Sequence, residues 1–274
     1  MNARLGAGLG LLGGLALLAL AAPVAEHLLG HDPYQPDLFA RYAPASGTHP
    51  LGTDELGRDV LLRLLRGARV SPAVGLATAL VAAALGALVG LLAAWRGGAV
   101  DAALMRLADG LLALPALPLL VVLAGADLSG IGLAPDLAGG DIIRIVAVLA
   151  LFGWMGVARL ARAAALGTLA LPYVRAARAL GASEARVLVR HVLPALASPV
   201  AVATALTVAG AILAESTLSF LGLGIRPPLS SWGNMLANAQ EMVLEAPWQA
   251  VWPGACIVAA VAGAGLVADG LRGR

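Results

Sequence analysis

Long apolar runs, largely free of charge, recur along the 274-residue chain and limit its fold more than any other feature. A membrane-spanning helix needs about 20 mainly apolar residues, because the hydrocarbon core of a bilayer is about 30 Å thick and each helical residue advances about 1.5 Å. Reading from one group of charges to the next predicts six such helices, over residues 5–25, 70–95, 103–126, 141–162, 192–214 and 246–268. We therefore predict an all-α, polytopic transmembrane helical bundle of about six spans.

The composition agrees with a membrane protein. Hydrophobic residues make up 60% of the chain and charged residues only 12%, with a mean hydropathy of +0.88. A soluble domain carries about 25% charged residues, so this chain would have too little polar surface to cover a core in water. The formal net charge of +2 gives no electrostatic support for nucleic-acid binding.

The residue types exclude several classes of active site. All eighteen basic residues are arginine, whereas a P-loop ATPase needs a lysine on the phosphates and a Schiff-base enzyme needs an amine. Cys256 is the one cysteine, so neither an internal disulfide nor a cysteine-based metal site is possible. The zinc-protease and nucleophile-elbow motifs are also absent from the sequence. We expect a chain that is not an enzyme and holds no cofactor of its own.

Arginine distribution predicts the orientation of the bundle. With the N-terminus inside, the inner segments hold eleven arginines and the outer segments seven, as the positive-inside rule requires. Both termini are then cytoplasmic. The first span also has features of a secretory signal peptide, namely Arg4, an apolar run and the small residues Ala19, Ala21 and Ala22. The length of the run and the single basic residue favour an uncleaved anchor.

The outer segment after the first span ends in a basic, leucine-rich stretch. Arg63, Arg66 and Arg69 recur every three residues, which predicts a helix lying along the membrane surface with its charges on one face. Asp59 lies four residues before Arg63, the favourable order for a helical ion pair. We therefore divide the chain into an anchor and outer segment, residues 1–70, and a five-helix core, residues 71–274.

The interruption between the fourth and fifth spans carries the clearest functional signal. Residues 159–191 hold six arginines and one glutamate, so they lie outside the lipid. Pro172 suits a first helical turn, Gly181 a helix stop, and Ser183 the cap of a second short helix with Glu184 in its first turn. The pattern predicts a cytoplasmic helix–glycine–helix element that docks a partner. An arginine-rich loop that binds anionic lipid headgroups is the alternative.

Residues 173–194 resemble the EAA signature of binding-protein-dependent ABC importer permeases. In that signature a Glu-Ala-Ala triplet is followed by a glycine four residues on, and later by Leu-Pro. The residues in register are Ala176, Ala177, Gly181, Leu193 and Pro194. Arg175 stands where the signature has glutamate. The resemblance implies the helix–glycine–helix shape and leaves open the charge pairing at that position.

Three further stretches resemble the dipeptide, oligopeptide and nickel branch of these permeases. They are residues 49–59, residues 96–106 and the motif after the fifth helix, residues 218–236. Together with the EAA-like segment they cover most of the chain from residue 49 onward, in the order and spacing of that branch. Their combination is specific, although a single glycine-rich stretch would not be.

The resemblance implies a permease subunit in a bacterial cytoplasmic membrane. Such a subunit pairs with a homologous second permease around a pathway for peptides or nickel, and an extracytoplasmic solute-binding protein delivers the cargo. Two separate ABC ATPase subunits, which bind ATP and magnesium, engage residues 172–190. The residues implied in this docking are Arg175, Ala176, Ala177, Gly181, Ala182, Ser183 and Glu184. A channel or an ion-coupled secondary transporter is the alternative, but such carriers commonly keep acids near the midplane of the bilayer.

Two acidic residues are candidates for the pathway or a gate, because a carboxylate inside the bilayer must face protein or water. Asp109 lies near the inner boundary, where Arg106 could pair with it in a helix-end ion pair. Glu215 closes the fifth span near the outer surface, either at a gate or as a hydrated carboxylate on the rim.

Three other features have both a structural and a functional interpretation. Pro115 and Pro118 predict a kink in the third span. Gly86 and Gly90 have the spacing that allows close helix packing. The histidines of the outer segment, among them His27 and His31, could bind a metal such as nickel, but surface histidines on a loop are the favoured interpretation.

Overall fold

The structure of the protein is a computed structural model that describes residues 3–126, 140–238, 241 and 245–273. Within these residues, ten helices form the bundle and its two ends. They are α1 (Ala3–Leu29), α2 (Val60–Arg96), α3 (Gly98–Leu112), α4 (Ala116–Gly125), α5 (Gly140–Leu169), α6 (Pro172–Ala179), α7 (Glu184–Val187), the π-helix η3 (Leu188–Val192), α8 (Leu193–Phe220) and α10 (Trp248–Arg272). Two short 3₁₀ helices, η1 (Leu38–Ala40) and η4 (Asn234–Leu236), lie in the connections.

In the part of the chain that the structure describes, five helical segments are long and apolar enough to cross a membrane: α1, α2, α5, the continuous run from α7 through α8, and α10. A sixth span is formed if α3 and α4 count together, but these two helices are bent by 86° relative to each other. The predicted third span is therefore broken and not merely kinked. Pro115 is the N-cap of α4, where its ring cannot continue the helix from α3. The prediction of an all-α bundle of about six spans is confirmed.

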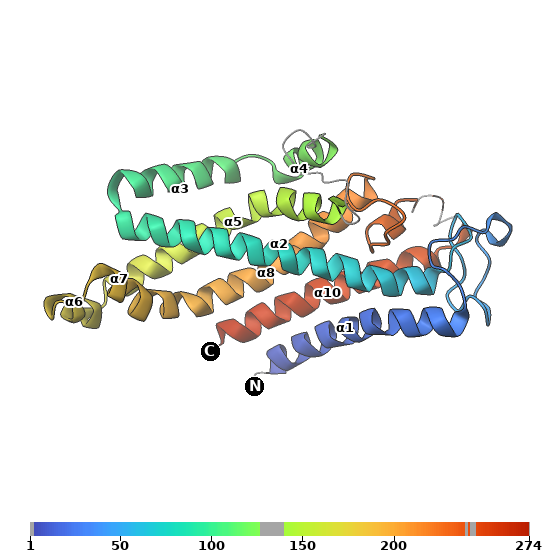
Figure 1. The fold of residues 1–274 in the computed structure, drawn as a ribbon, viewed down its shortest axis with the longest axis horizontal. Helices are drawn as coiled ribbons and strands as arrows, with labels where there is room; N and C mark the ends of the chain where they lie inside the picture. Colours follow the sequence, from blue (N-terminus) through green and yellow to red (C-terminus); the bar gives the residue numbers. More distant parts are fainter. Residues whose placement is uncertain (1–2, 127–139, 239–240, 242–244, 274) are drawn as a thin grey trace.

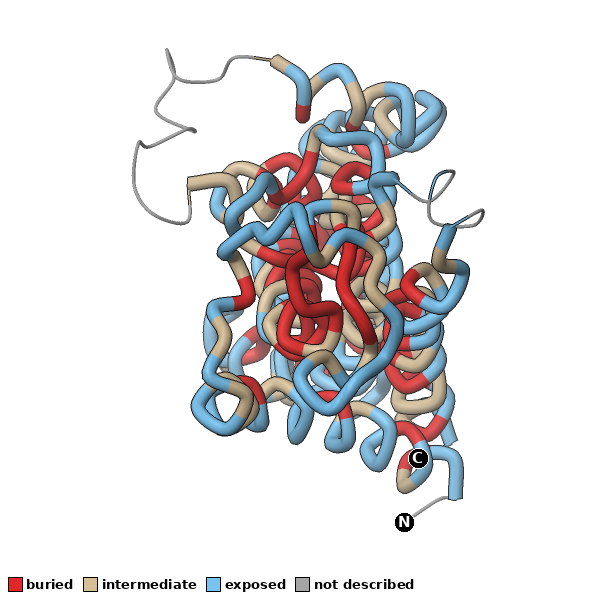
Figure 2. The backbone as a smooth tube through the Cα atoms, turned by 90° about the vertical axis from the view of Figure 1, so that its right-hand side faces the viewer, coloured by how far each residue is buried: buried red, intermediate tan, exposed pale blue. Residues whose placement is uncertain are grey.

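The helices run side by side in an elongated bundle with two distinct ends (Figure 1). One end carries α6 and α7, and both chain termini lie toward it. We call residues 172–190, at this end, the basic element. The opposite end is formed by residues 30–59 and 221–237, which we call the cap. Figure 2, viewed from the cap end, shows the buried residues gathered in the middle of the bundle.

Glycines allow the closest helix contacts. A Cβ atom on Gly86 would lie 2.5 Å from the carbonyl oxygen of Trp154, and one on Gly90 would lie 2.3 Å from that of Ala158. These glycines therefore hold α2 against α5 with almost no space between the backbones, as their spacing predicted. A similar contact joins α1 to α10, where a Cβ on Gly8 would lie 2.7 Å from the carbonyl oxygen of Gly263.

The prediction of a separate surface helix before the second span is wrong. The segment around Arg63, Arg66 and Arg69 forms the first turns of α2, which continues without interruption to Arg96. The physical reason is that all three arginines have partners within the protein and do not need the headgroup region. The boundary predicted at residue 70 consequently falls inside a helix.

Candidate functional site

The basic element folds through the local signals read from the sequence. α6 begins with Pro172, and Gly181 adopts a φ of +85°, a conformation that residues with a side chain rarely adopt. Ser183 is the N-cap of α7 and its hydroxyl accepts a hydrogen bond from the backbone N–H of Arg186 at 3.4 Å. The predicted helix–glycine–helix shape is therefore observed.

The apolar side of the element is fixed against the bundle. Val174 of α6 and Val187 of α7 are fully buried and belong to one apolar cluster with Ala94 of α2 and Ala165 of α5. The aromatic rings of Tyr173 and His191 also lie near each other, with centroids 5.6 Å apart. The element is thus packed against the ends of two long helices, and through η3 it leads directly into α8.

The opposite side of the element faces away from the protein. Leu180, at the turn, is 89% exposed, and Tyr173 is 50% exposed. The Arg178 guanidinium forms an ion pair with the Glu184 carboxylate at 2.9 Å, across the Gly181 turn. Arg175 is also exposed.

The residues predicted to dock an ATPase come together on this one turn. Among them the exposed ones are Arg175, Ala176, Gly181, Ser183 and Glu184, and the half-buried ones are Ala177 and Ala182. Their proximity is a fact of the structure, whereas their docking role stays a prediction.

Asp109 pairs with a different arginine from the one expected. Its carboxylate lies 3.5 Å from the Arg159 guanidinium of α5, and the side chains are 56% and 59% exposed. A second ion pair, between Asp101 and Arg162, joins the same two helices at 2.5 Å. The expected pair with Arg106, within α3, is not among the ion pairs of the described residues. Asp109 therefore links two helices on an exposed face of the bundle and does not close a helix end.

Glu215 is buried, so the expectation of a hydrated carboxylate on the rim is wrong. Its two oxygens accept hydrogen bonds from the Ser71 hydroxyl of α2 at 2.9 Å and the Ser219 hydroxyl of α8 at 2.7 Å. These donors stabilise the carboxylate within the bundle, where water would otherwise be needed.

The same two serines also accept hydrogen bonds from the backbone of the cap. The Ser71 hydroxyl accepts from the backbone N–H of Trp232 at 3.1 Å, and the Ser219 hydroxyl accepts from that of Ile225 at 2.9 Å. Trp232 is fully buried and its indole N–H donates to the carbonyl oxygen of Leu64 at 3.3 Å. One carboxylate therefore holds α2, α8 and the following loop together.

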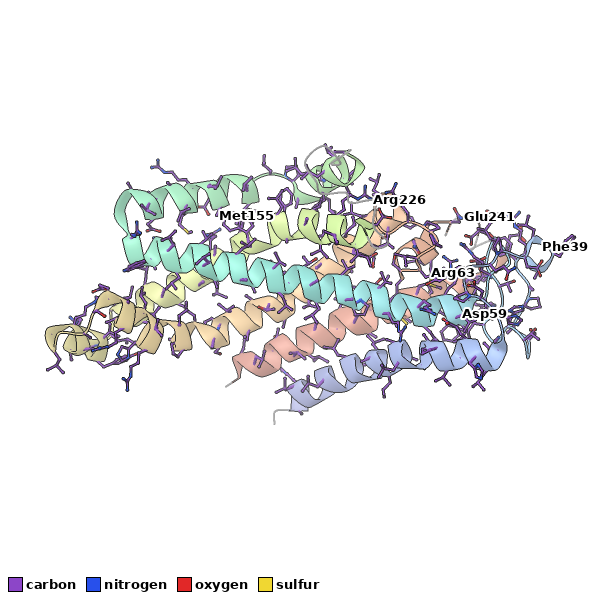
Figure 3. The ribbon with its side chains drawn as sticks, in the orientation of Figure 1. Phe39, Asp59, Arg63, Met155, Arg226 and Glu241 are labelled. Carbon is purple, nitrogen blue, oxygen red and sulfur yellow. The ribbon has the colours of Figure 1, made fainter. Side chains whose placement is uncertain are left out.

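A buried ionic network lies between the cap and the start of α2. Asp54 pairs with Arg58 at 2.8 Å and also with Arg63, whose position near the cap is visible in Figure 3. Asp59 caps α2 by accepting from the backbone N–H of Leu62 at 2.8 Å. The expected Asp59–Arg63 pair is replaced by these two interactions. The pairing of Arg63 was missed because Asp54 lies in a segment without helical or strand periodicity.

The two neighbouring arginines of α2 contact α1. Arg66 forms an ion pair with Glu26, and Arg69 donates to the carbonyl oxygen of Ala19 at 2.9 Å. On another side of the cap, Arg226 pairs with Asp141 at 2.8 Å, and this hydrogen bond raises the pKa of the guanidinium. The charged side chains named at this end therefore have partners within the chain.

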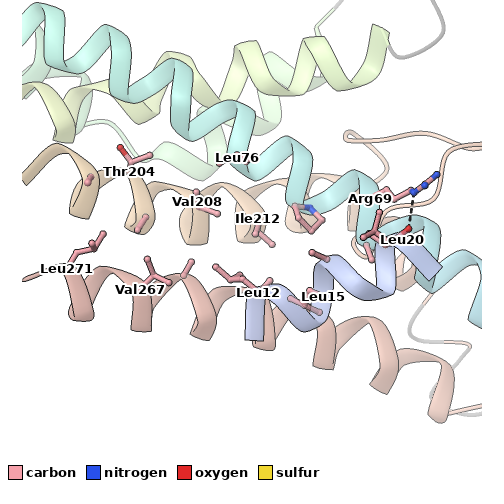
Figure 4. A pocket seen from close by; sticks show the side chains of 18 residues that line it. Leu12, Leu15, Leu20, Arg69, Leu76, Thr204, Val208, Ile212, Val267 and Leu271 are labelled. Atoms are coloured by element: carbon pink, nitrogen blue, oxygen red, sulfur yellow. Dashed lines mark hydrogen bonds between the residues drawn. The ribbon is translucent and has the colours of Figure 1, made fainter. Parts of the chain in front are cut away.

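An apolar groove of about 860 Å³ lies between α1, α2, α8 and α10 (Figure 4). Its walls are aliphatic, for example Leu15, Leu76 and Ile212, and its polar lining residues are Arg69 and Thr204. Such walls can hold an aliphatic chain but offer few groups for a polar cargo.

The two histidines of the cap, His31 and His49, contact each other and a neighbouring carboxylate. The ring of His31 stacks on that of His49 at 4.9 Å, and the Nδ1 atom of His49 lies 2.9 Å from the Asp59 carboxylate. Within the described residues no group of three histidine, cysteine or acidic side chains has an arrangement suited to a metal ion.

Known proteins resemble this chain in sequence over most of its length. Residues 86–274 match the family described as binding-protein-dependent transport system inner membrane component. The chain is 38% identical over 258 residues to a protein of Brucella suis biovar 1 named as a peptide transport system permease, covering 94% of this chain and 83% of the relative. It is 36% identical, with the same coverage, to the probable D,D-dipeptide transport system permease protein of Escherichia coli K12. A peptide permease protein of Brucella suis is 38% identical over 245 residues, covering 88% of this chain and 78% of the relative.

Proposed function

Because the chain belongs to the family of binding-protein-dependent transport system inner membrane components, we propose that it is one of two permease subunits of an ATP-driven peptide importer. The second subunit is a homologous permease, and the pathway runs between the two. This chain forms no bond with its cargo and breaks none. Its role is to provide part of the path and to transmit movement.

Peptides are the proposed cargo. The relatives named for a peptide and a D,D-dipeptide transport system support this choice, at 38% and 36% identity over most of the chain. Nickel, the other cargo of the same branch, has no comparable support from those names. A solute-binding protein on the outer side delivers the peptide to the cap end of the bundle.

The basic element carries the proposal for energy coupling. Its buried side is packed against α2 and α5, it continues into α8, and its exposed side presents a turn with Leu180 at its tip. A partner that binds this turn can therefore move three long helices at once. We assign that partner as an ABC ATPase, which binds the ATP and magnesium, so two ATPases serve the pair of permeases.

The proposed orientation places the basic element and both termini in the cytoplasm. The arginine count supports it, because the inner segments hold eleven arginines against seven outside. Both termini lie toward the end that carries α6 and α7, as an even number of spans requires (Figure 1). The cap then faces the outer side of the cytoplasmic membrane.

The first test is purification of the tagged chain in mild detergent, followed by mass spectrometry of the proteins bound to it. We expect a second permease and one or two P-loop ATPases. The purified assembly, reconstituted into vesicles with its binding protein, should take up labelled dipeptide when ATP is supplied on the side of the basic element. A chain that purifies without any ATPase, even after cross-linking, would overturn the importer proposal and favour a channel or an ion-coupled carrier.

A further inference from the structure

The exposed side of the basic element is strongly positive. Residues 172–190 contain four arginines and one glutamate, a formal charge of +3. Glu184 is already paired with Arg178. The other arginines, Arg175, Arg186 and Arg190, are exposed and take part in no ion pair within the described residues.

The apolar and aromatic side chains of the element bear on the kind of surface that it can bind. A helix that lies on a membrane needs a free apolar face to insert between headgroups. Here part of the apolar surface is occupied, because Val174 and Val187 are fully buried against α2 and α5. The exposed apolar side chains of the element are Leu180, Val189 and Tyr173, which are 89%, 64% and 50% exposed. Exposed tyrosine and arginine side chains, here Tyr173 and Arg175, are of the residue types that contribute most to binding in protein interfaces.

The length of α5 also separates the element from the bilayer. Its 30 residues span about 45 Å, which matches the full thickness of about 40–45 Å of a bilayer with its headgroups. α6 follows α5 after two residues. The arginines that come after it therefore lie at or beyond the headgroup boundary, within reach of a soluble subunit.

From these observations we propose that the ATPase groove that receives the basic element is acidic opposite Arg175. This inference rests on the proposed function and adds the chemistry of the partner surface. Arg175 is exposed and takes part in no ion pair within the described residues, so a basic partner surface would repel it and an acidic one would attract it. Complementary charges at an interface set partner choice and association rate, and like charges facing each other cost several kcal/mol. An acidic groove would thus restrict this permease to its own ATPases.

Arg175 is the residue that tests the proposal most directly. Arg178 forms an ion pair with Glu184 across the Gly181 turn. Substituting Arg178 would therefore change both the contact with the groove and the turn itself. Arg272, near the end of α10, is a matched control because it is an exposed arginine of a different helix, 3.9 Å from Asp269.

The experiment compares the amount of ATPase recovered with the tagged wild-type chain and with the variants Arg175→Gln, Arg175→Glu and Arg272→Glu, at low and high salt. We expect Arg175→Glu to lower recovery at least about tenfold and Arg175→Gln by a smaller factor, with Arg272→Glu close to wild type. High salt should weaken the wild-type complex and remove most of the difference between wild type and Arg175→Gln. A photo-reactive residue at position 176 then cross-links to the groove and identifies it. Replacing the acidic residue of the ATPase groove with arginine should restore binding of the Arg175→Glu variant.

Any other result would contradict either the acidic groove or the proposed function. Equal recovery for all variants, or better recovery with Arg175→Glu, overturns the acidic groove and leaves the importer proposal intact. Loss of binding to anionic vesicles with unchanged ATPase recovery assigns the arginines to the membrane surface instead. Absence of any ATPase from the wild-type sample contradicts the proposed function itself.

Discussion

The two ends of this molecule carry charge in opposite ways. At the cap end, Asp54 and Arg63 are only 2% and 4% exposed, and each is held by a partner within the chain. At the other end, Arg175 is exposed and lacks an ion-pair partner among the described residues, while the pair that is present, Arg178–Glu184, lies on the surface. The same side-chain chemistry is therefore structural at one end and available to partners at the other.

Desolvation explains why the two ends differ. A buried charge without a partner costs several kcal/mol, so the charges of the cap must satisfy one another for the fold to form. A solvated charge costs little and can change without loss of the fold. The comparison gives a rule for this chain: substitutions at the cap should change stability, and substitutions on the basic element should change assembly. Four substitutions test the rule.

The largest effect is expected from Asp54→Ala. Removing this carboxylate leaves Arg58 and Arg63 buried without their shared partner, and breaking a buried pair from one side costs roughly 3–5 kcal/mol. Unfolding of the purified chain in detergent, followed by tryptophan fluorescence, measures the loss. The control Arg175→Gln should stay within about 0.5 kcal/mol of wild type. A loss below that of the control would mean that the cap network does not stabilise the fold.

A smaller loss is expected from Glu215→Ala. The hydroxyls of Ser71 and Ser219 lose their acceptor, and each buried donor left unsatisfied costs roughly 1–3 kcal/mol. Glu215→Gln keeps one acceptor oxygen and should retain most of the stability. Because Glu215 is also a pathway candidate, transport distinguishes the two roles. A Glu215→Gln chain that is stable but does not transport peptide would point to contact with the cargo.

Ser183→Ala should produce a local effect of about 1 kcal/mol, because it removes the cap of α7. Hydrogen exchange should become faster in residues 184–187 and stay unchanged in the cap. The matched variant Ser183→Asn keeps a side-chain oxygen for the cap and should behave like wild type. Faster exchange across the whole bundle would contradict the separation between the two ends.

The smallest effect on stability is expected from Arg178→Ala, since exposed ion pairs contribute only about 0.2–1 kcal/mol. A double-mutant cycle with Glu184→Ala measures the coupling energy of the pair. Recovery of ATPase should nevertheless fall, because the variant removes a positive charge from the exposed turn. A coupling energy above about 2 kcal/mol would mean that this exposed pair is as strong as the buried pairs of the cap. The two ends would then not differ in the way described.

The sequence was most informative where structure depends on local signals. Pro172, Gly181 and Ser183 predicted the basic element, since helix starts and stops are set by backbone preferences within a few residues. Uncharged runs likewise predicted the spans, because lipid imposes one length on all of them. The shape of the third span was predicted less well, since Pro115 shows where a helix ends but not the direction of the next one.

The sequence was least informative where charges find distant partners. Arg63, Arg66 and Arg69 have the spacing of a surface helix, yet their partners lie outside α2: Asp54 is in the cap, and Glu26 and Ala19 are in α1. Glu215 alone gave no sign that Ser71, from a helix 144 residues earlier, would hold it inside the bundle. Such pairings depend on how the helices assemble, and a single sequence does not encode them in any local pattern.

The contacts between the N-terminal part of the chain and its C-terminal part have a consequence for biosynthesis. Gly8 of α1 packs against Gly263 of α10, the Gln249 amide donates to the carbonyl oxygen of Thr53, and Arg41 pairs with Glu241. A ribosome makes one member of each of these pairs early and the other near the end. The cap therefore gains its contacts with Glu241 and Gln249 only after most of the chain has been made, and a chain truncated before residue 241 lacks both of them.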